Sequence, residues 1–367
     1  MSDYKKIIFN EFNEDVWTFL SKTQKPILIY GMGNGADKII SIFEKYGIEY
    51  KDVFASDEFV RGHSYRGKTV ISYSKACEIY GNNFIIVVSF GSKLPNVINR
   101  IYNLEKNHMV FCPDVPVCDG ELFNEDFFDL HESELYAARN LLYDNTSKNV
   151  YDDIIRFKLS GMPKYLRSTS FDENEIDSIL NLEKYKSYAD LGAYNGDTIK
   201  KYTTICPNIN TIYAFEPDSR NFRKLSKYCD TLNDINAHLY NFAVCDCDRI
   251  LEFSSSGNRN STGASNGSYQ HKTIEIQGKA IDKIVENVDF IKYDVEGLEY
   301  NALLGSKETI NKFQPDLLIS MYHKSEDMYE LPLLVNKINS RYKLFLRRLP
   351  YIPAWDLNLY AINDNNI

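Results

Sequence analysis

The chain has 367 residues, which is long enough for two domains that each bury a core of their own. Hydrophobic residues make up 44% and charged residues 25%, close to the globular average, and this excludes a mainly disordered, collagen-like or coiled-coil chain. The net charge is −9 and no run of Lys and Arg is interleaved with aromatic residues, so nucleic acid is not an expected partner.

Short apolar runs and scattered cysteines set the expected location of the protein. The run from Phe84 to Val88 is far shorter than the roughly 20 residues that a membrane-spanning helix needs. The sequence after Met1 is polar and has no apolar signal core, so we expect a cytoplasmic protein. Seven cysteines without a Cys-x-x-Cys pair argue against a disulfide framework and against a zinc knuckle.

Residues 1–115 are predicted to form a Rossmann-like α/β domain. An apolar strand from Ile27 leads into the turn Gly31-Met-Gly33-Asn-Gly35, a helical pattern to Tyr46 and a strand at 53–55. A second apolar run at 84–90 precedes a helical pattern over 94–104. The repeated order of strand and helix predicts a small parallel sheet.

The glycine turn of this domain only partly fits a dinucleotide site. Ala36 follows Gly35, and a third glycine at the usual spacing is missing. Asp57 lies near the distance at which an acidic residue favours NAD, without a clear strand around it. The turn therefore leaves an NAD site open as an alternative without establishing one.

Residues 116–183 are predicted to be a helical connector, and residues 184–367 a second α/β domain. The second domain contains five candidate strands with helical patterns between most of them: 188–191, 212–215, 239–244, 290–293 and 317–321. This alternation predicts a doubly wound sheet. A long polar loop over 254–268 and its neighbour His271 offer Arg259 and Asn260 for a phosphate or sugar, or form a solvated tip.

A nucleoside signal opens the second domain. Asp190-Leu-Gly-Ala-Tyr-Asn-Gly-Asp-Thr198 stands where a strand should end and a helix begin, so its glycines allow backbone amides to approach a ligand. The next strand ends in Glu216-Pro-Asp218, where a carboxylate can accept hydrogen bonds from ribose hydroxyls. The two features together point to a bound nucleoside.

These segments, with Asn241-Phe-Ala-Val244 and Phe290-Ile-Lys-Tyr-Asp-Val-Glu-Gly-Leu-Glu299, resemble the FkbM family of S-adenosylmethionine-dependent methyltransferases over about residues 185–363. The resemblance implies a seven-stranded class I methyltransferase sheet whose last, antiparallel strand contains Tyr360. It also implies S-adenosylmethionine as cofactor, with Glu216 on its ribose and the segment from Ala243 to Asp246 beside its adenine. The residues expected to bind the cofactor are Asp190, Gly192, Ala193, Tyr194, Gly196, Asp197, Thr198, Glu216, Asp218 and Asp246.

The end of the fourth strand carries the candidate catalytic groups. Asp294 and Glu296 are two residues apart and can share a face, while His323 follows the neighbouring strand. Two carboxylates and an imidazole suit a divalent ion such as Mg²⁺, Mn²⁺ or Fe²⁺, which would lower the pKa of a bound hydroxyl. Alternatively Asp294 caps a helix or contacts the cofactor. Lys292 lies two residues before Asp294 and can share the same face of the strand. It is either a catalytic base or a buried ion-pair partner.

Three functions remain open at this point. The leading one is O-methylation of a sugar hydroxyl, on a nucleotide-activated or glycan-bound sugar of surface polysaccharide assembly, and the sugar is implied by the resemblance. The second is an NAD-dependent sugar-modifying oxidoreductase that uses the first domain. The third is a non-catalytic module that binds nucleotide sugars. The sequence does not decide whether the protein forms a homo-oligomer.

Overall fold

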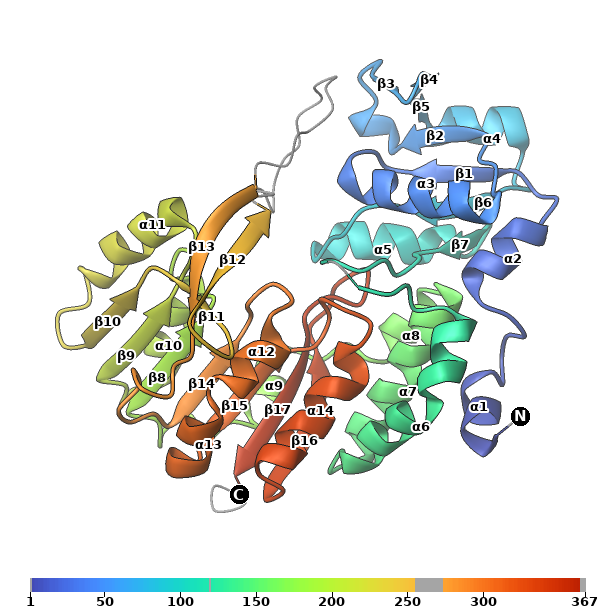
Figure 1. Ribbon diagram of the computed structural model, residues 1–367. Coiled ribbons are helices and arrows are strands. Elements are labelled where there is room, and N and C mark those ends of the chain that lie inside the picture. Colours follow the sequence, from blue (N-terminus) through green and yellow to red (C-terminus); the bar gives the residue numbers. More distant parts are fainter. Residues whose placement is uncertain (1, 119, 255–272, 364–367) are drawn as a thin grey trace.

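The structure, a computed structural model, describes residues 2–118, 120–254 and 273–363. Two α/β sheets are joined by a group of helices (Figure 1). No helix in these ranges combines the length and the apolar character needed to cross a membrane.

The N-terminal sheet is parallel, with the order β5-β2-β1-β6-β7. This is the strand order 3-2-1-4-5 of a Rossmann-type sheet. Its central strands form because each is a short, wholly buried run of apolar residues. The strands are β1 (Ile27–Tyr30), β2 (Asp52–Ala55), β5 (Ile71–Ser72), β6 (Ile85–Val88) and β7 (Met109–Phe111), with a small hairpin of β3 (Ser64–Tyr65) and β4 (Lys68–Thr69).

Helices cover both faces of this sheet. Residues of α2 and α3 pack with Ile29 and Val53, whereas residues of α4 and α5 pack with Leu28 and Phe54, because successive side chains of a strand point to opposite faces. The helices are α1 (Asp3–Ile8), α2 (Val16–Lys22), α3 (Asn34–Tyr46), α4 (Tyr73–Tyr80) and α5 (Pro95–Leu104). A short 3₁₀ helix spans Asp57–Phe59.

Four helices connect the two sheets: α6 (Glu125–Leu141), α7 (Asn145–Ser160), α8 (Lys164–Arg167) and α9 (Glu173–Asp177). Buried residues of α6 and α7 belong to one continuous apolar core with residues from both sheets. The helices therefore also stabilise the arrangement of the two sheets, because their buried side chains pack in one core with residues of both sheets.

The C-terminal sheet has the order β10-β9-β8-β14-β15-β17-β16, in which β17 is antiparallel to both of its neighbours. Tyr360 lies in β17, and the arrangement confirms the α/β fold class and the seven-stranded sheet that the resemblance implies. The strands are β8 (Ser187–Leu191), β9 (Thr211–Phe215), β10 (Asn236–Tyr240), β14 (Phe290–Tyr293), β15 (Asp316–Ser320), β16 (Tyr342–Arg348) and β17 (Leu357–Asn363).

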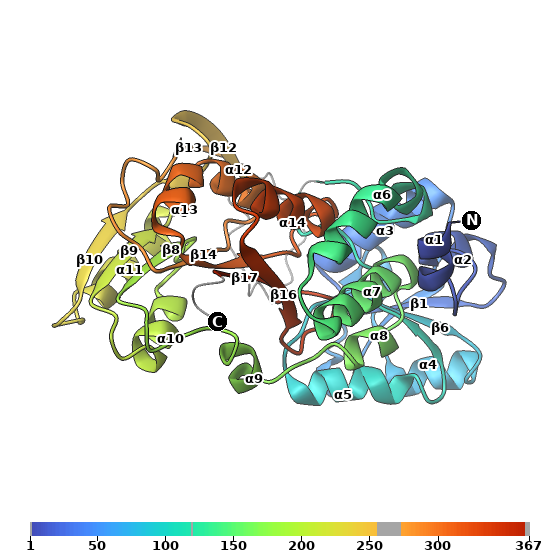
Figure 2. The ribbon, with the colours of Figure 1, turned by 90° about the horizontal axis from the view of Figure 1, so that it is seen from below.

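Two groups of helices sandwich this sheet (Figure 2). Tyr188 and Phe290 pack with α9, α10 and α11, while Leu191 and Tyr293 pack with α12, α13 and α14. The helices are α10 (Asp197–Ile205), α11 (Ser219–Cys229), α12 (Glu299–Leu304), α13 (Lys307–Phe313) and α14 (Asp327–Ile338). The doubly wound arrangement leaves only the strand ends open to a ligand.

One predicted strand is wrong in its extent. Residues 239–244 do not form a single strand, because β10 ends at Tyr240 and β11 (Ala243–Val244) joins a separate sheet with β12 (Arg249–Ser254) and β13 (Thr273–Lys279). The break lies at Asn241, whose side-chain amide donates to the carbonyl oxygens of Glu216 and Pro217 at 2.8 and 3.2 Å. These bonds hold the chain against the end of β9.

Contacts between the two halves lie beside the carboxyl ends of the C-terminal strands. Ser92, after β6, exchanges two backbone hydrogen bonds with Ile352, in the loop between β16 and β17, at 2.8 and 3.0 Å. The amides of Val117 and Cys118 donate to the carbonyl oxygen of His323 at 3.1 and 3.3 Å. The first half of the chain is thus fixed next to the predicted site.

Candidate active site

Apart from Asp246, which follows β11, the predicted site residues lie at or just after the carboxyl ends of four strands at one edge of the sheet: β8, β9, β14 and β15. From β8 the chain continues to β9 on one side of β8, whereas β14 pairs with β8 on its other side. The carboxyl ends of β8 and β14 therefore border the switch point of the doubly wound sheet. The amide of Asp294 donates to the carbonyl oxygen of Leu191 at 3.0 Å and closes the two loops against each other.

Glycine is required in the turn after β8. Gly192 has φ +89°, and a Cβ atom there would lie 1.9 Å from the carbonyl oxygen of Asp294. Gly196 also has φ +89° and faces the ring of Tyr228, which would be 2.7 Å from an added Cβ. Both positions combine a left-handed backbone with close packing, which brings the turn into contact with the loop after β14 at Gly192 and with α11 at Gly196.

Asp190 fixes this turn through its buried side chain. Its side chain is fully buried, accepts a hydrogen bond from the Thr198 hydroxyl at 2.7 Å and lies 3.3 Å from the Lys292 ammonium. The Asp197 carboxylate, by contrast, is exposed in the first turn of α10, and Ala193 is buried. Asp190 therefore holds the turn in place, and Asp197 stays accessible beside it.

Glu216 is buried at the end of β9 and turned toward the loop after β8. Its two carboxylate oxygens accept hydrogen bonds from the amides of Tyr194 and Asp218, both at 2.8 Å. Burial raises the pKa of Glu216 to about 7. Each carboxylate oxygen has two acceptor positions, so these bonds leave room for hydroxyl groups of a ligand.

Asp218 and Asp246 have structural partners. Asp218 caps α11 by accepting hydrogen bonds from the amides of Arg220 and Asn221, both at 2.9 Å. Asp246 follows β11 and pairs with Arg249 at 2.9 Å. Asp218 therefore serves as the cap of α11, and Asp246 lies at the small sheet of β11, β12 and β13.

Lys292 is a buried ion-pair partner, which is one of the two roles that its place in the strand predicts. Its ammonium is buried between the carboxylates of Asp190 and Asp294, at 3.3 and 3.4 Å. Although burial opposes the charge, these two carboxylates raise the pKa of Lys292 above its usual range. The lysine stays protonated and is unsuited to accept a proton as a base.

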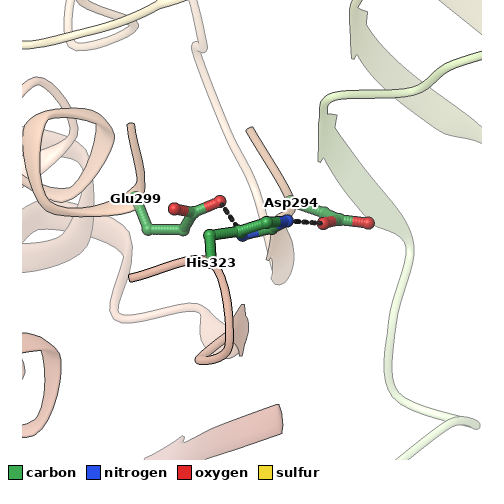
Figure 3. A group of neighbouring side chains, drawn as sticks. All are labelled: Asp294, Glu299 and His323. Atoms are coloured by element: carbon green, nitrogen blue, oxygen red, sulfur yellow. Dashed lines mark ion pairs between the residues drawn. The ribbon is translucent and has the colours of Figure 1, made fainter. Parts of the chain in front are cut away.

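His323 lies between carboxylates on both sides of its ring (Figure 3). Its Nε2 atom is 3.6 Å from a carboxylate oxygen of Asp294 and 3.6 Å from one of Glu296. Its Nδ1 atom is 3.0 Å from Glu299. Burial lowers the affinity of the ring for a proton, but the three carboxylates prevail and raise the pKa of His323 to about 9.

Glu299 is the site residue that sequence reasoning missed, although it stands in the motif that carries the resemblance. It begins α12, is fully buried, and one carboxylate oxygen accepts a hydrogen bond from the Val295 amide at 2.8 Å. The available signal was an acidic residue in the first turn of a helix just after Asp294 and Glu296. Asp294, Glu299 and His323 bring potential ligand atoms within 4.8 Å of one another.

The backbone is unusual where Glu296 enters this cluster. Glu296 has φ +55°, and Tyr194, across the same edge, has φ +48°. Left-handed conformations of residues other than glycine cost energy and tend to gather at functional sites. Cys118 of the connector donates its thiol to the Glu296 carbonyl oxygen at 3.0 Å, so the connector supports this strained loop.

Buried polar atoms of the cluster lack hydrogen-bond partners within the described part of the chain. They are Nε2 of His323, which lies 3.6 Å from the carboxylate oxygens nearest to it, and the second carboxylate oxygen of Glu299. Buried polar groups are normally paired, so this geometry is incomplete without a further group. An imidazole nitrogen beside oxygen donors from Asp294 and Glu296 is a donor set that fits a divalent ion.

The glycine turn of the N-terminal sheet is built for packing. A Cβ atom on Gly35 would lie 2.1 Å from the Ser89 carbonyl oxygen, so this glycine lets α3 approach β6. Asp57 accepts a hydrogen bond from the Ser74 amide at 3.0 Å and thus has a partner in α4. Arg259, Asn260 and His271 lie outside the described residues.

Comparison with known proteins identifies the C-terminal part of the chain. Residues 190–347 match the family profile described as the methyltransferase FkbM domain. The match assigns an FkbM methyltransferase domain to these residues. The match contains the turn after β8, Glu216, and the whole His323 cluster, and S-adenosylmethionine-dependent methylation is the activity that the FkbM assignment supports.

One solved structure extends the likeness to the whole fold. The FkbM methyltransferase of Methylobacillus flagellatus is 17% identical with a TM-score of 0.68, and the alignment covers 99% of this chain and 94% of that protein. Aeropyrum pernix fibrillarin, solved with bound S-adenosylmethionine, is 15% identical with a TM-score of 0.32, covering 50% of this chain and 69% of that protein. No curated protein matches the chain.

Proposed function

We propose that the protein transfers a methyl group from S-adenosylmethionine to a hydroxyl group of a sugar, on a nucleotide-activated or glycan-bound acceptor. The observation that carries the choice of a hydroxyl is the His323 cluster, which places carboxylates beside the cofactor turn at the switch point. An acceptor hydroxyl must lose a proton during transfer, and this cluster offers groups that can receive it.

We assign cofactor binding to the turn after β8 and to the carboxyl end of β9. The segment from Gly192 to Thr198 binds the methionine part through its backbone, and Glu216 accepts hydrogen bonds from the ribose hydroxyls. When bound, S-adenosylmethionine supplies an electrophilic methyl group on a sulfonium. Asp190 and Lys292 act as positioning residues, because they touch the turn and Asp294 from inside the core.

Asp294 is the residue that we assign to the acceptor. Its side chain is 15% exposed, whereas His323 is 1% exposed, so Asp294 can meet a hydroxyl that His323 cannot reach directly. The acceptor oxygen forms a bond to the methyl carbon as the sulfur–carbon bond breaks, and the hydroxyl proton goes to the Asp294 carboxylate. Lys292 and His323 fix the orientation of that carboxylate.

A divalent ion is part of the proposal. Asp294 and Glu296 would hold it through carboxylate oxygens and His323 through Nε2. Glu299 at Nδ1 would orient the ring, as carboxylates commonly do for metal-binding histidines. Such an ion would lower the pKa of the acceptor hydroxyl. His323 must be neutral to bind an ion, so its pKa of about 9 makes metal affinity rise with pH up to that value.

The function is tested by mass spectrometry on a panel of nucleotide sugars incubated with S-adenosylmethionine. We expect one acceptor to gain the mass of one methyl group, on oxygen. Calorimetry with S-adenosylmethionine and NAD separates the alternatives. Binding of NAD alone would support the oxidoreductase, and binding of nucleotide sugars without turnover on any acceptor would support the non-catalytic module.

We expect Glu216→Ala to weaken S-adenosylmethionine binding by about 1.5–3 kcal/mol, roughly 10- to 150-fold, because it removes a charged acceptor for ribose hydroxyls. Calorimetry measures the dissociation constant. Glu286→Ala, which removes an exposed carboxylate of the same domain, is the control and should bind as the wild type does. An unchanged constant for Glu216→Ala would place the ribose elsewhere.

The raised pKa of His323 predicts a pH-dependent stability in chelator-treated protein. Below about pH 6.5 the ring is charged in both folded and unfolded chains, and the stabilisation by its carboxylates is fully present. As pH rises to about 9 this stabilisation is lost, and we expect the free energy of unfolding to fall by about 3 kcal/mol. Urea unfolding at several pH values measures it. His323→Asn should show a flatter dependence, and equal slopes would contradict the prediction.

A further inference from the structure

Two hollows in the N-terminal half of the molecule lie along α5, away from the methyltransferase site. The first has a volume of about 540 Å³ and lies against β1, β2 and the start of α4. The second has a volume of about 780 Å³ and lies between α5 and α8. Both volumes fall in the range of small-molecule sites, and no residue of the candidate active site lines either hollow.

A row of asparagines connects the two hollows. Asn96, Asn99, Asn103 and Asn107 follow one another at intervals of three, four and four residues, which places them on one face of α5 and its end. All four line the first hollow, and Asn99 and Asn103 also line the second. The two hollows are therefore adjacent and share this ridge.

The asparagines do not contribute to the fold in an evident way. Asparagine is a poor helix former, because its side chain competes for backbone hydrogen bonds. Across the described ranges, the carboxamides of these residues take part in no protein hydrogen bond, and all four residues are exposed. Four such amides on one face thus present unused donors and acceptors to whatever enters the hollows.

The other walls of the first hollow are aromatic or already neutralised. The half-buried ring of Tyr73 lines it, whereas the rings of Tyr30 and Phe54 at the same hollow are buried. Arg100 forms an ion pair with Glu58. Asp57, which also lines it, accepts a hydrogen bond from the Ser74 amide. One guanidinium against two carboxylates leaves the first hollow with a net negative charge.

In the second hollow Lys164 and Arg167 form ion pairs with Glu11 and Glu105, and Lys106 adds one positive charge. The two hollows together have no excess of positive charge that would favour a phosphate or another anion.

We propose that these hollows bind a neutral, hydroxyl-rich ligand, namely sugar units of an oligosaccharide. A hydroxyl group both donates and accepts hydrogen bonds, and a carboxamide offers both functions on one planar group. The half-buried ring of Tyr73 suits the apolar C–H face of a sugar ring. Because two hollows share Asn99 and Asn103, the site accommodates more than one sugar unit.

The proposal does not depend on the proposed function, because binding at α5 requires neither S-adenosylmethionine nor the His323 cluster. It also differs from the dinucleotide alternative, since the hollows lie on the α4 and α5 side of the sheet, and the glycine turn leads into α3 on the other side. Failure of methyl transfer and failure of sugar binding at α5 are thus separate results.

Saturation-transfer NMR and calorimetry on the full chain test the site with a panel of neutral disaccharides: maltose, cellobiose, lactose and mannobiose. We expect at least one to bind, and the double variant Asn99→Leu/Asn103→Leu to weaken its binding at least tenfold. Leucine matches asparagine in size and favours a helix, so the fold should persist. Asn149→Leu, at an exposed position of α7, is the matched control and should bind normally.

Three outcomes would overturn the proposal. One is that no disaccharide of the panel binds to the folded protein. Another is that the double variant, with an unchanged melting temperature, binds the disaccharide as the wild type does. The third is that inorganic phosphate competes the disaccharide away from α5, which would show an anion site.

Discussion

Asp294→Asn is expected to slow methyl transfer by about two to four orders of magnitude, which is the usual contribution of a positioned acid or base. The substitution keeps the size of the side chain but removes the negative charge that faces Lys292 and His323. S-adenosylmethionine binding should change far less, because we propose that the turn after β8 and Glu216 hold the cofactor. Single-turnover rates and calorimetry measure the two effects separately.

Asp248→Asn is the matched control, because it makes the same substitution at an exposed position of the same domain. It should leave both the rate and the cofactor affinity unchanged. If Asp294→Asn transferred methyl groups at the wild-type rate, Asp294 would have no part in handling the acceptor proton. A melting curve shows whether the Asp294→Asn protein, which lacks the charge opposite Lys292, still folds as stably as the wild type.

Removal of divalent ions is the second prediction with a large effect. Treatment with a chelator is expected to abolish methyl transfer and to leave S-adenosylmethionine affinity within about twofold, because the proposed ion would act on the acceptor and not on the cofactor. Adding back Mg²⁺ or Mn²⁺ should restore the rate. His323→Ala should behave like the chelated protein and require more metal for activity, since it loses the Nε2 ligand.

The pH dependence sharpens this test. An unperturbed histidine ligand would lose metal below about pH 6. The carboxylates around His323 move the expected change upward, because its pKa is about 9, so the metal concentration needed for activity should fall steadily from pH 7 to pH 9. Full activity in a metal-free sample would reject the ion, and Asp294, Glu296 and His323 would then only position the acceptor.

The sequence pattern predicted strands and turns in both sheets where a buried apolar run is followed by a glycine. β1 and β6 are uniformly apolar, and the turn after β8 needs glycine because its backbone is left-handed and packed against Asp294. The split after Tyr240 could not be predicted in the same way. It depends on the Asn241 side chain reaching Glu216 and Pro217, more than 20 residues away in the sequence.

The candidate site shows the same division. Asp294, Glu296 and His323 could be predicted to converge, because carboxyl ends of parallel neighbouring strands share an edge. The role of Lys292 and that of Glu299 required the structure. Lys292 becomes an ion-pair partner only because Asp190 is fully buried beside it, and Glu299 reaches His323 only because α12 begins where it does. Long-range packing decides both.

The most direct test of the central claim is a crystal structure of the protein with S-adenosylhomocysteine. We predict its ribose hydroxyls within hydrogen-bonding distance of the Glu216 carboxylate, its methionine part along the turn from Gly192 to Thr198, and its sulfur facing Asp294. Density for the molecule at the glycine turn between β1 and α3, or at any place away from the ends of β8 and β14, would contradict the account.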